Sequence, residues 1–128
     1  NEKNIKYTIC EGFNSKKDFE IMLNNFIKNN FIPKIKIDGI FAVTDKYALN
    51  FIKKIKNLKI NIPDDVQIIG FDGSKSSIED DFKISTIRQP VELIAKESVK
   101  ILLKIIESKK VEKEVILPIK FIKGYTTK

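Results

Sequence analysis

The sequence predicts an α/β fold with three layers and a mainly parallel sheet. Short apolar runs at residues 40–43 and 66–71 are typical of strands that are covered on both faces. Between them lies an amphipathic run whose apolar residues recur with helical spacing, at Ala48, Phe51, Ile52 and Ile55. Strand, crossover helix and strand form a βαβ unit. Its strands should therefore be parallel and its crossover right-handed.

A second βα unit is predicted before the central one. Residues 6–10 are expected to form a strand, in which Cys10 is interpreted as a small buried hydrophobic residue. Ser15 is a good helix N-cap, and Asp18 three residues later resembles a capping box. One apolar face then predicts a helix from Ser15 to about Lys28, with core positions at Phe19, Met22, Leu23, Phe26 and Ile27.

After Gly73 the chain becomes polar, and residues 74–81 are predicted to be a loop whose acidic end is solvated. Residues 84–87 are expected to be extended. Pro90 suits the first turn of a helix that ends near Ser108. Residues 115–122 are predicted to be a strand, which Pro118 would place at an edge or a bulge.

Composition limits the classes of function. With 128 residues the chain suits one domain, or one lobe of a larger domain, and without an initiating methionine it looks cut from a longer protein. No apolar run is long enough to cross a bilayer, so no membrane partner is expected. A single cysteine excludes an internal disulfide and favours a reducing compartment. Without histidine or a glycine-rich phosphate loop, neither an enzyme nor a cofactor is expected.

The net charge of +7, from 24 basic and 17 acidic residues, raises the question of nucleic-acid binding. Arg88 is the single arginine, whereas arginine would be expected wherever base edges are read by paired hydrogen bonds. The lysines are spread over the predicted helices. They are interpreted as solvated helix faces, and the high lysine, isoleucine and asparagine content as the codon bias of an AT-rich genome.

The candidate site lies where the predicted strands end, because ligands of open parallel sheets bind outside the carboxyl ends of the strands. Carboxylates accept hydrogen bonds from hydroxyls, and aromatic faces pack against sugars or bases. A small-molecule site is therefore predicted along this edge, formed by Phe13, Asn14, Thr44, Phe71 and Asp72.

Each of these residues also has a structural interpretation. Asp72 could cap its own turn, and Thr44 could simply end a strand. Asp45 is interpreted as the cap of the following helix rather than as a ligand contact. Phe13, Asn14 and Phe71 could line the pocket or belong to the core. The Asp64–Asp65 pair after Pro63 is interpreted as a turn and not as a metal site.

Three blocks of sequence together resemble a known family. They are A-V-T-D-x-x-A-L at residues 42–49, I-P-D-D-V-x-I-I-G-F-D at residues 62–72 and S-T-I-R-Q-P at residues 85–90. Their order and spacing are similar to those of the effector-binding domain of LacI/GalR-type transcriptional repressors, from about residue 11 to residue 125.

The resemblance implies a function. In this family a DNA-binding helix-turn-helix precedes a two-lobed domain like that of periplasmic sugar-binding proteins, and a small effector between the lobes changes operator affinity. By resemblance, Asp72 and Thr44 would contact the effector. In this family an aromatic residue that follows an early Glu-Gly-Asp block often stacks on the effector. Here that block reads E-G-F-N at residues 11–14, so Phe13 lies one place early and Asn14 takes its position.

The resemblance also implies an organisation. Residues 1–84 would be the C-terminal lobe, incomplete at its start. Residues 85–112 would hold the crossing segment and a helix that packs on a missing N-terminal lobe, and residues 113–128 the return strand and tail. Without that lobe the helix would expose an apolar stripe, and the chain is expected to form dimers or to exchange elements. The stripe comprises Ile94, Val99, Leu102 and Ile106.

The chain is thus interpreted as the ligand-sensing fragment of a cytoplasmic, homodimeric bacterial repressor. It would bind a small effector, with a sugar favoured over a purine, and operator DNA would be bound by a region absent from this chain. The alternative is a fragment of a secreted sugar-binding protein of an ABC transporter, which an upstream signal peptide would indicate. A flavodoxin-like or receiver-like enzyme would need a phosphate loop or an acidic cluster that the sequence lacks.

Overall fold

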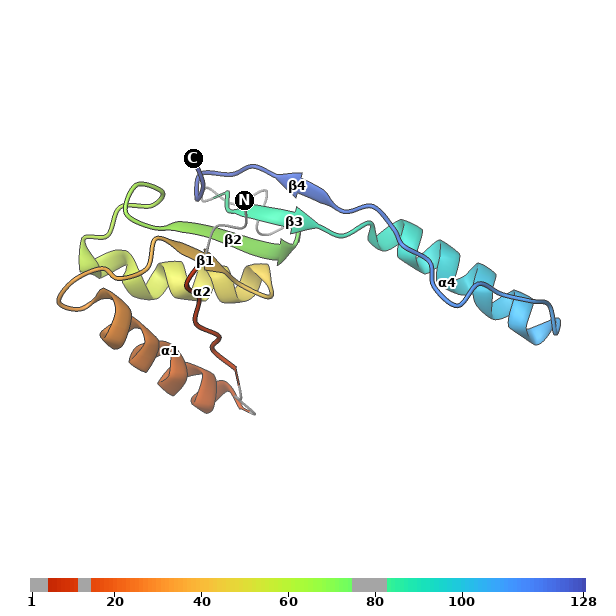
Figure 1. Cartoon of the computed structure of the whole chain (residues 1–128), viewed down its shortest axis with the longest axis horizontal. Coiled ribbons are helices and arrows are strands. Elements are labelled where there is room, and N and C mark those ends of the chain that lie inside the picture. Colours follow the sequence, from red (N-terminus) through yellow and green to blue (C-terminus); the bar gives the residue numbers. More distant parts are fainter. Residues whose placement is uncertain (1–4, 12–14, 75–82) are drawn as a thin grey trace. The chain divides into compact units, whose positions relative to one another are not determined.

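The structure is a computed structural model that describes residues 5–11, 15–74 and 83–128 (Figure 1). The chain divides into two compact units, which we call the N-terminal unit (Asn1–Asp38) and the sheet unit (Gly39–Lys128). None of the helices in the described ranges has the length and hydrophobicity of a membrane span.

The sheet unit is built on four strands among the described residues, and their order in the sheet follows the sequence. The strands β1, β2 and β3 are parallel, whereas β4 runs antiparallel to β3. Their bounds are β1 (Gly39–Phe41), β2 (Gln67–Asp72), β3 (Ser85–Arg88) and β4 (Lys120–Ile122). The predicted α/β fold with a mainly parallel sheet is thus confirmed.

The helix α2 (Asp45–Ile55) connects β1 to β2, continues into the short 3-10 helix η1 (Lys56–Leu58), and packs against β2 (Figure 1). Its predicted apolar stripe is buried except at Ile52, which is half-buried. Fully burying one large aliphatic side chain stabilises a fold by about 1.5–3 kcal/mol, so this face anchors the crossover. The most deeply buried apolar side chains of the unit are Ala48, Ile55, Val66, Ile68 and Ile84. A helix layer on the other face of the sheet stays a prediction.

The strand β1 was predicted to be covered on both faces, but in the structure its apolar side chains are largely exposed. It has three residues and lies at the edge of the sheet, and Phe41 and Val43 are each 61% exposed. No described strand pairs with its outer side, and this is why the apolar run remains accessible. The Phe41 ring does contact Phe71 of β2 edge-on, with centroids 6.3 Å apart.

In the N-terminal unit, α1 (Lys16–Phe31) begins as predicted. Ser15 caps it: its hydroxyl accepts a hydrogen bond from the Asp18 amide at 3.1 Å and donates to the Asp18 carboxylate at 2.8 Å. The helix ends at Phe31 rather than near Lys28, since the buried face continues through Phe31.

The strand expected at residues 6–10 is not formed, so that prediction is wrong in this structure. These residues pair with no strand among the described residues, and all of them are exposed. Cys10 is exposed as well, which contradicts its interpretation as a buried residue. A parallel strand needs a partner for its backbone groups, and local sequence cannot supply one.

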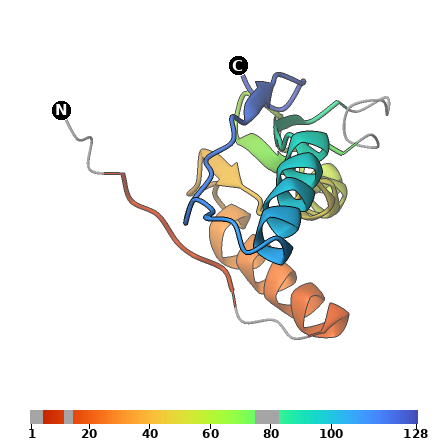
Figure 2. The ribbon, with the colours of Figure 1, turned by 90° about the vertical axis from the view of Figure 1, so that its right-hand side faces the viewer.

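The helix α4 (Val91–Ile106) starts directly after Pro90 and ends close to the predicted Ser108. None of its residues is buried, and Val99 and Leu102 are 57% and 56% exposed. The expected exposed apolar stripe is therefore present. Residues 107–119 then return beside α4 to β4 (Figures 1 and 2). The predicted strand at residues 115–122 is shorter than expected, because it begins only after Pro118, which has no N–H to donate.

The C-terminal tail ties β2 to β3 near their amino ends, a role that no local sequence pattern predicts. The fully buried Thr126 hydroxyl donates to the carbonyl of Ile68 at 2.6 Å and accepts from the amide of Ser85 at 2.8 Å. The Ile68 amide in turn donates to the Thr126 carbonyl at 2.8 Å. One side chain thereby satisfies backbone groups of two neighbouring strands.

We predict that Thr126→Val lowers the free energy of unfolding by about 1–3 kcal/mol, because two buried backbone groups lose their partner. Urea denaturation followed by circular dichroism measures this change. The matched control is Thr8→Val at an exposed position, which should change the free energy by less than about 0.5 kcal/mol. Equal effects of the two substitutions would contradict the role of the tail.

Candidate functional site

The carboxyl ends of β1, β2 and β3 lie along one edge of the sheet, because the three strands are parallel. Thr44 and Asp45 follow β1, Asp72 ends β2, and Gln89 follows β3. Asp72 lies beside Arg88 in the register of β2 and β3. We call these four positions, Thr44, Asp45, Asp72 and Gln89, the carboxyl edge.

Asp72 has an unusual backbone and a well-defined side-chain partner. Its φ is +117°, in a region that costs a residue other than glycine about 1–3 kcal/mol. Its Oδ1 accepts a hydrogen bond from Nε2 of Gln89 at 2.8 Å, and the Gln89 amide donates to the Asp72 carbonyl at 3.3 Å. The described residues offer no hydrogen-bond partner to Oδ2. One carboxylate oxygen is therefore held and the other is available.

The turn after Asp72 lies tightly against β3. Gly73 has a φ of +66°, and a Cβ at this position would come within 2.6 Å of the Arg88 Cβ. Glycine is required here on both counts. The Gly73 amide donates to Oγ1 of Thr86 at 3.2 Å, which fixes the turn to the middle of β3.

Asp45 is not the helix cap that the sequence predicts. The cap is Thr44, whose Oγ1 accepts from the Tyr47 amide at 3.3 Å. Asp45 is the first helical residue and is 2% exposed. Its carboxylate accepts from the Thr86 hydroxyl at 2.5 Å and from the Ser74 amide at 2.7 Å. Both the positive end of α2 and these donors favour a buried negative charge at this point.

Gly70 makes room for this buried carboxylate. A Cβ on Gly70 would overlap with Oδ1 of Asp45, so only glycine lets the helix start approach β2 so closely. Since Gly70 lies beside Thr86 in the register of the sheet, the carboxylate reaches the Thr86 hydroxyl across the bare backbone of β2. The G-F-D and S-T blocks of the sequence therefore meet at Asp45.

The other predicted site residues have different surroundings. Thr44 is half-buried and uses its oxygen as a cap, which leaves its hydroxyl proton free to donate. Phe71 is half-buried and lies on the opposite face of β2 from Gly70, against Phe41. Phe13 and Asn14 lie outside the described residues.

Gln89 was missed from the sequence. It belongs to the R-Q-P block and directly follows the third parallel strand, so the rule that pointed to Thr44 and Asp72 would also have selected it. The Asp64–Asp65 pair is a turn, as predicted: the Asp65 carboxylate accepts from the Asn61 amide at 2.8 Å. No cluster of three or more potential metal ligands occurs among the described residues.

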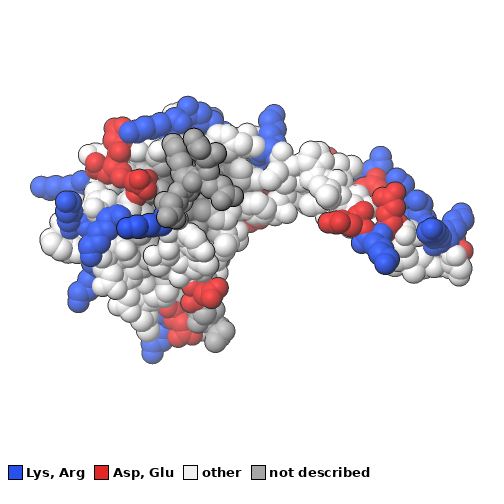
Figure 3. Space-filling model, viewed as in Figure 1, with Lys and Arg blue, Asp and Glu red and all other residues white. Residues whose placement is uncertain are grey.

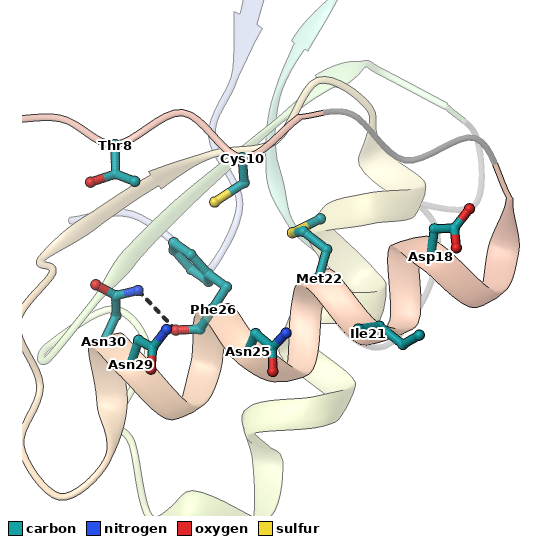
Figure 4. A pocket seen from close by; sticks show the side chains of 9 residues that line it. All are labelled: Thr8, Cys10, Asp18, Ile21, Met22, Asn25, Phe26, Asn29 and Asn30. Atoms are coloured by element: carbon teal, nitrogen blue, oxygen red, sulfur yellow. Dashed lines mark hydrogen bonds between the residues drawn. The ribbon is translucent and has the colours of Figure 1, made fainter.

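A groove of about 560 Å³ lies in the N-terminal unit between α1 and residues 8–10 (Figure 4). The Cys10 sulfur and the side chains of Met22 and Phe26 point into it. Although Cys10 is exposed as a residue, partial burial raises the pKa of its thiol above the ordinary value, so the reactive thiolate is disfavoured. The described residues of the predicted site do not line this groove.

Basic side chains are distributed over the visible face of the sheet unit and along α4, with acidic residues between them (Figure 3). On this face the distribution agrees with the interpretation of the lysines as solvated surface.

Comparison with known proteins identifies the fold family. Residues 4–127 match the profile of the periplasmic binding protein-like domain. The sucrose operon repressor of Streptococcus mutans is 39% identical over 90 residues, which are 70% of this chain and 28% of the repressor.

Two solved structures are similar as well. A periplasmic binding protein/LacI transcriptional regulator from Alkaliphilus metalliredigens, in complex with D-xylulofuranose, has a TM-score of 0.63 and 34% identity over 91% of this chain and 39% of its own. A LacI family transcriptional regulator from Enterococcus faecium with bound ribose has a TM-score of 0.68 and 27% identity over 88% of this chain and 40% of its own.

A mainly parallel sheet with polar groups at its carboxyl edge is typical of α/β domains that bind small molecules. The chain belongs to the periplasmic binding protein-like domain family, in the form found in the effector-binding domains of LacI/GalR-type repressors. The resemblance stated from the sequence is thereby confirmed. These relatives carry the names of transcriptional regulators, and the chain spans less than a third of the length of the curated relative.

We predict that Gly70→Ala lowers the free energy of unfolding by about 1–3 kcal/mol, because the added methyl group displaces the buried Asp45 carboxylate. Gly39→Ala is the matched control in the same sheet, since a Cβ there meets nothing within 4 Å. The control should change stability by at most about 1 kcal/mol in either direction. Thermal and urea denaturation of the two variants provide the comparison, and similar losses would contradict the packing described for Asp45.

Proposed function

We propose that this chain is the effector-sensing part of a bacterial transcriptional repressor, and that its effector is a sugar. The observation that supports this most directly is the Asp72 carboxylate, with one oxygen held by Gln89 and the other without a partner among the described residues. A carboxylate that is fixed through one oxygen presents its other oxygen in a defined direction, where it is a strong acceptor for sugar hydroxyls.

The relatives support a sugar over other effectors. One similar regulator binds ribose, another binds D-xylulofuranose, and a third represses a sucrose operon by its name. We assign hydrogen bonds to the effector to Asp72 and Thr44, and an apolar wall to Phe71. Phe13 and Asn14 complete the proposed set of contacts.

The proposed mechanism is a shift of population. A ligand changes the balance between two arrangements of a sensor domain only as far as it binds one more tightly, and such coupling typically amounts to about 1–3 kcal/mol. In the longer protein, residues 1–84 would contribute to one lobe, residues 85–112 would cross to the other, and residues 113–128 would return. Operator DNA would be bound by a separate helix-turn-helix, in the cytoplasm, and the chain would perform no catalysis.

Substitution of Asp72 tests this proposal. We expect Asp72→Ala and Asp72→Asn to weaken binding of the recognised sugar by roughly 10- to 100-fold, the cost of losing a hydrogen bond to a charged group. Isothermal titration calorimetry with ribose, xylulose and sucrose on the full chain measures this, and circular dichroism checks folding. Asparagine tolerates a positive φ, so the second variant separates loss of charge from loss of backbone conformation.

Asp64→Ala is the matched control, because Asp64 is an exposed turn carboxylate. It should leave sugar affinity unchanged. Unchanged affinity of folded Asp72 variants, or no binding of any of the three sugars, would count against the proposed site.

We further propose that the chain forms homodimers, and that without another lobe its α4 stripe drives association. The combined substitution Val99→Lys and Leu102→Lys should then convert the dimer to a monomer in sedimentation velocity, because two half-exposed apolar contacts become charged. Lys96→Gln on the same helix is the control and should leave the dimer intact. A monodisperse monomer of the unchanged chain would contradict this expectation.

A further inference from the structure

We propose that Asp45 and Thr86 are a positioning pair that fixes Asp72 for contact with the effector, without touching the effector themselves. The inference rests on the proposed function of Asp72. It assigns to two buried polar residues a role that neither helix capping nor strand pairing explains.

The pair binds the two backbone amides that follow Asp72. The Ser74 amide donates to Oδ2 of Asp45 at 2.7 Å, and the Gly73 amide donates to Oγ1 of Thr86 at 3.2 Å. The Thr86 hydroxyl links the two residues of the pair by donating to Oδ1 of Asp45. A backbone amide can only donate, so Oγ1 of Thr86 accepts from Gly73 and directs its own proton to Asp45.

Both side chains of the pair are buried, and the amides that they bind are part-buried. Asp45 is 2% exposed and Thr86 is fully buried. Hydrogen bonds in such surroundings compete with little water, whereas a buried carboxylate without donors would be strongly unfavourable. Since Thr44 caps α2, capping does not account for a carboxylate at this point. The Asp45 carboxylate instead holds the turn after β2, directly through the Ser74 amide and indirectly through Thr86.

The conformation of Asp72 depends on that turn. With a φ of +117°, Asp72 persists only while its surroundings hold it. Gln89, which follows β3, holds the side chain and the carbonyl of Asp72, and the Asp45–Thr86 pair holds the amides of the next two residues. If the pair is broken, Asp72 can return to a negative φ, and its carboxylate then leaves the orientation in which Oδ2 is available.

Thr86→Val tests the pair, because valine keeps the shape of threonine and removes the hydroxyl. On the full chain we expect amide exchange at Gly73 and Ser74 to accelerate about tenfold relative to Ile69 of β2, and sugar affinity to fall roughly fivefold to tenfold. The scalar coupling between the Asp72 amide and α protons should change with φ. Thr86→Ser restores the hydroxyl and should restore all three measurements.

Thr126→Val is the matched control for a general loss of stability, because Thr126 is also a fully buried threonine whose hydroxyl binds backbone groups. It should leave the Asp72 coupling and the affinity unchanged. If Thr86→Val behaves in the same way, with Gly73 and Ser74 exchange and the Asp72 coupling unaltered, the positioning role is overturned.

The outcomes separate the two proposals. If Asp72→Asn weakens binding of ribose, xylulose or sucrose and Thr86→Val does not, the positioning role fails while the proposed site stands. In the Asp72→Asn background, Thr86→Val should cost no further affinity, because the pair acts through Asp72. If none of the three sugars binds, the proposed sugar site fails. Amide exchange and the Asp72 coupling then still decide whether the pair controls Asp72.

Discussion

The buried carboxylate of Asp45 is the interaction on which the carboxyl edge depends. Burial of a charge is tolerated only where donors surround it, and here the donors come from β3 and from the turn after β2. This requirement explains several residues at once. Gly70 must lack a side chain, position 86 must carry a hydroxyl, and Thr44 must take over the helix cap. The three sequence blocks of the family resemblance meet around Asp45: the first supplies the carboxylate, the second supplies the space at Gly70, and the third supplies the Thr86 hydroxyl.

Hydroxyl side chains join β2 to β3 near both ends of β2. Thr126 joins the strands near their amino ends, and Thr86 joins β3 to the turn at the carboxyl end of β2. The strand β2 is thereby restrained near both of its ends. Rigid elements position binding groups more accurately than loops do. From this restrained edge the chain passes through Gln89 and Pro90 directly into α4, so the partner of Asp72 is also the residue that leads into the exposed helix.

Local pattern was sufficient for much of the fold and insufficient wherever a distant partner decided the outcome. Helical spacing and cap residues predicted α1, α2 and α4, and an apolar run predicted β2. The exposure of β1 and the missing strand at residues 6–10 depend on which strands pair, which local sequence does not contain. Thr44 and Asp45 are both good caps, and the choice between them was made by Thr86, 41 residues away in sequence. Asp72 was predicted from the strand it ends, whereas its φ and its bond to Gln89 require the register of the folded sheet.

The same hydrogen bonds favour one kind of effector. A loop that binds phosphate or another anion presents free backbone amides to it. At this edge the amides of Gly73 and Ser74 are already bound by Thr86 and Asp45, so they are occupied before any ligand arrives. What the edge offers is an acceptor, the second oxygen of Asp72, whose negative charge would repel an anion. A neutral molecule rich in O–H donors meets this arrangement without displacing any internal hydrogen bond. Because the acceptor is already oriented, binding such a molecule would lose little conformational entropy on the protein side.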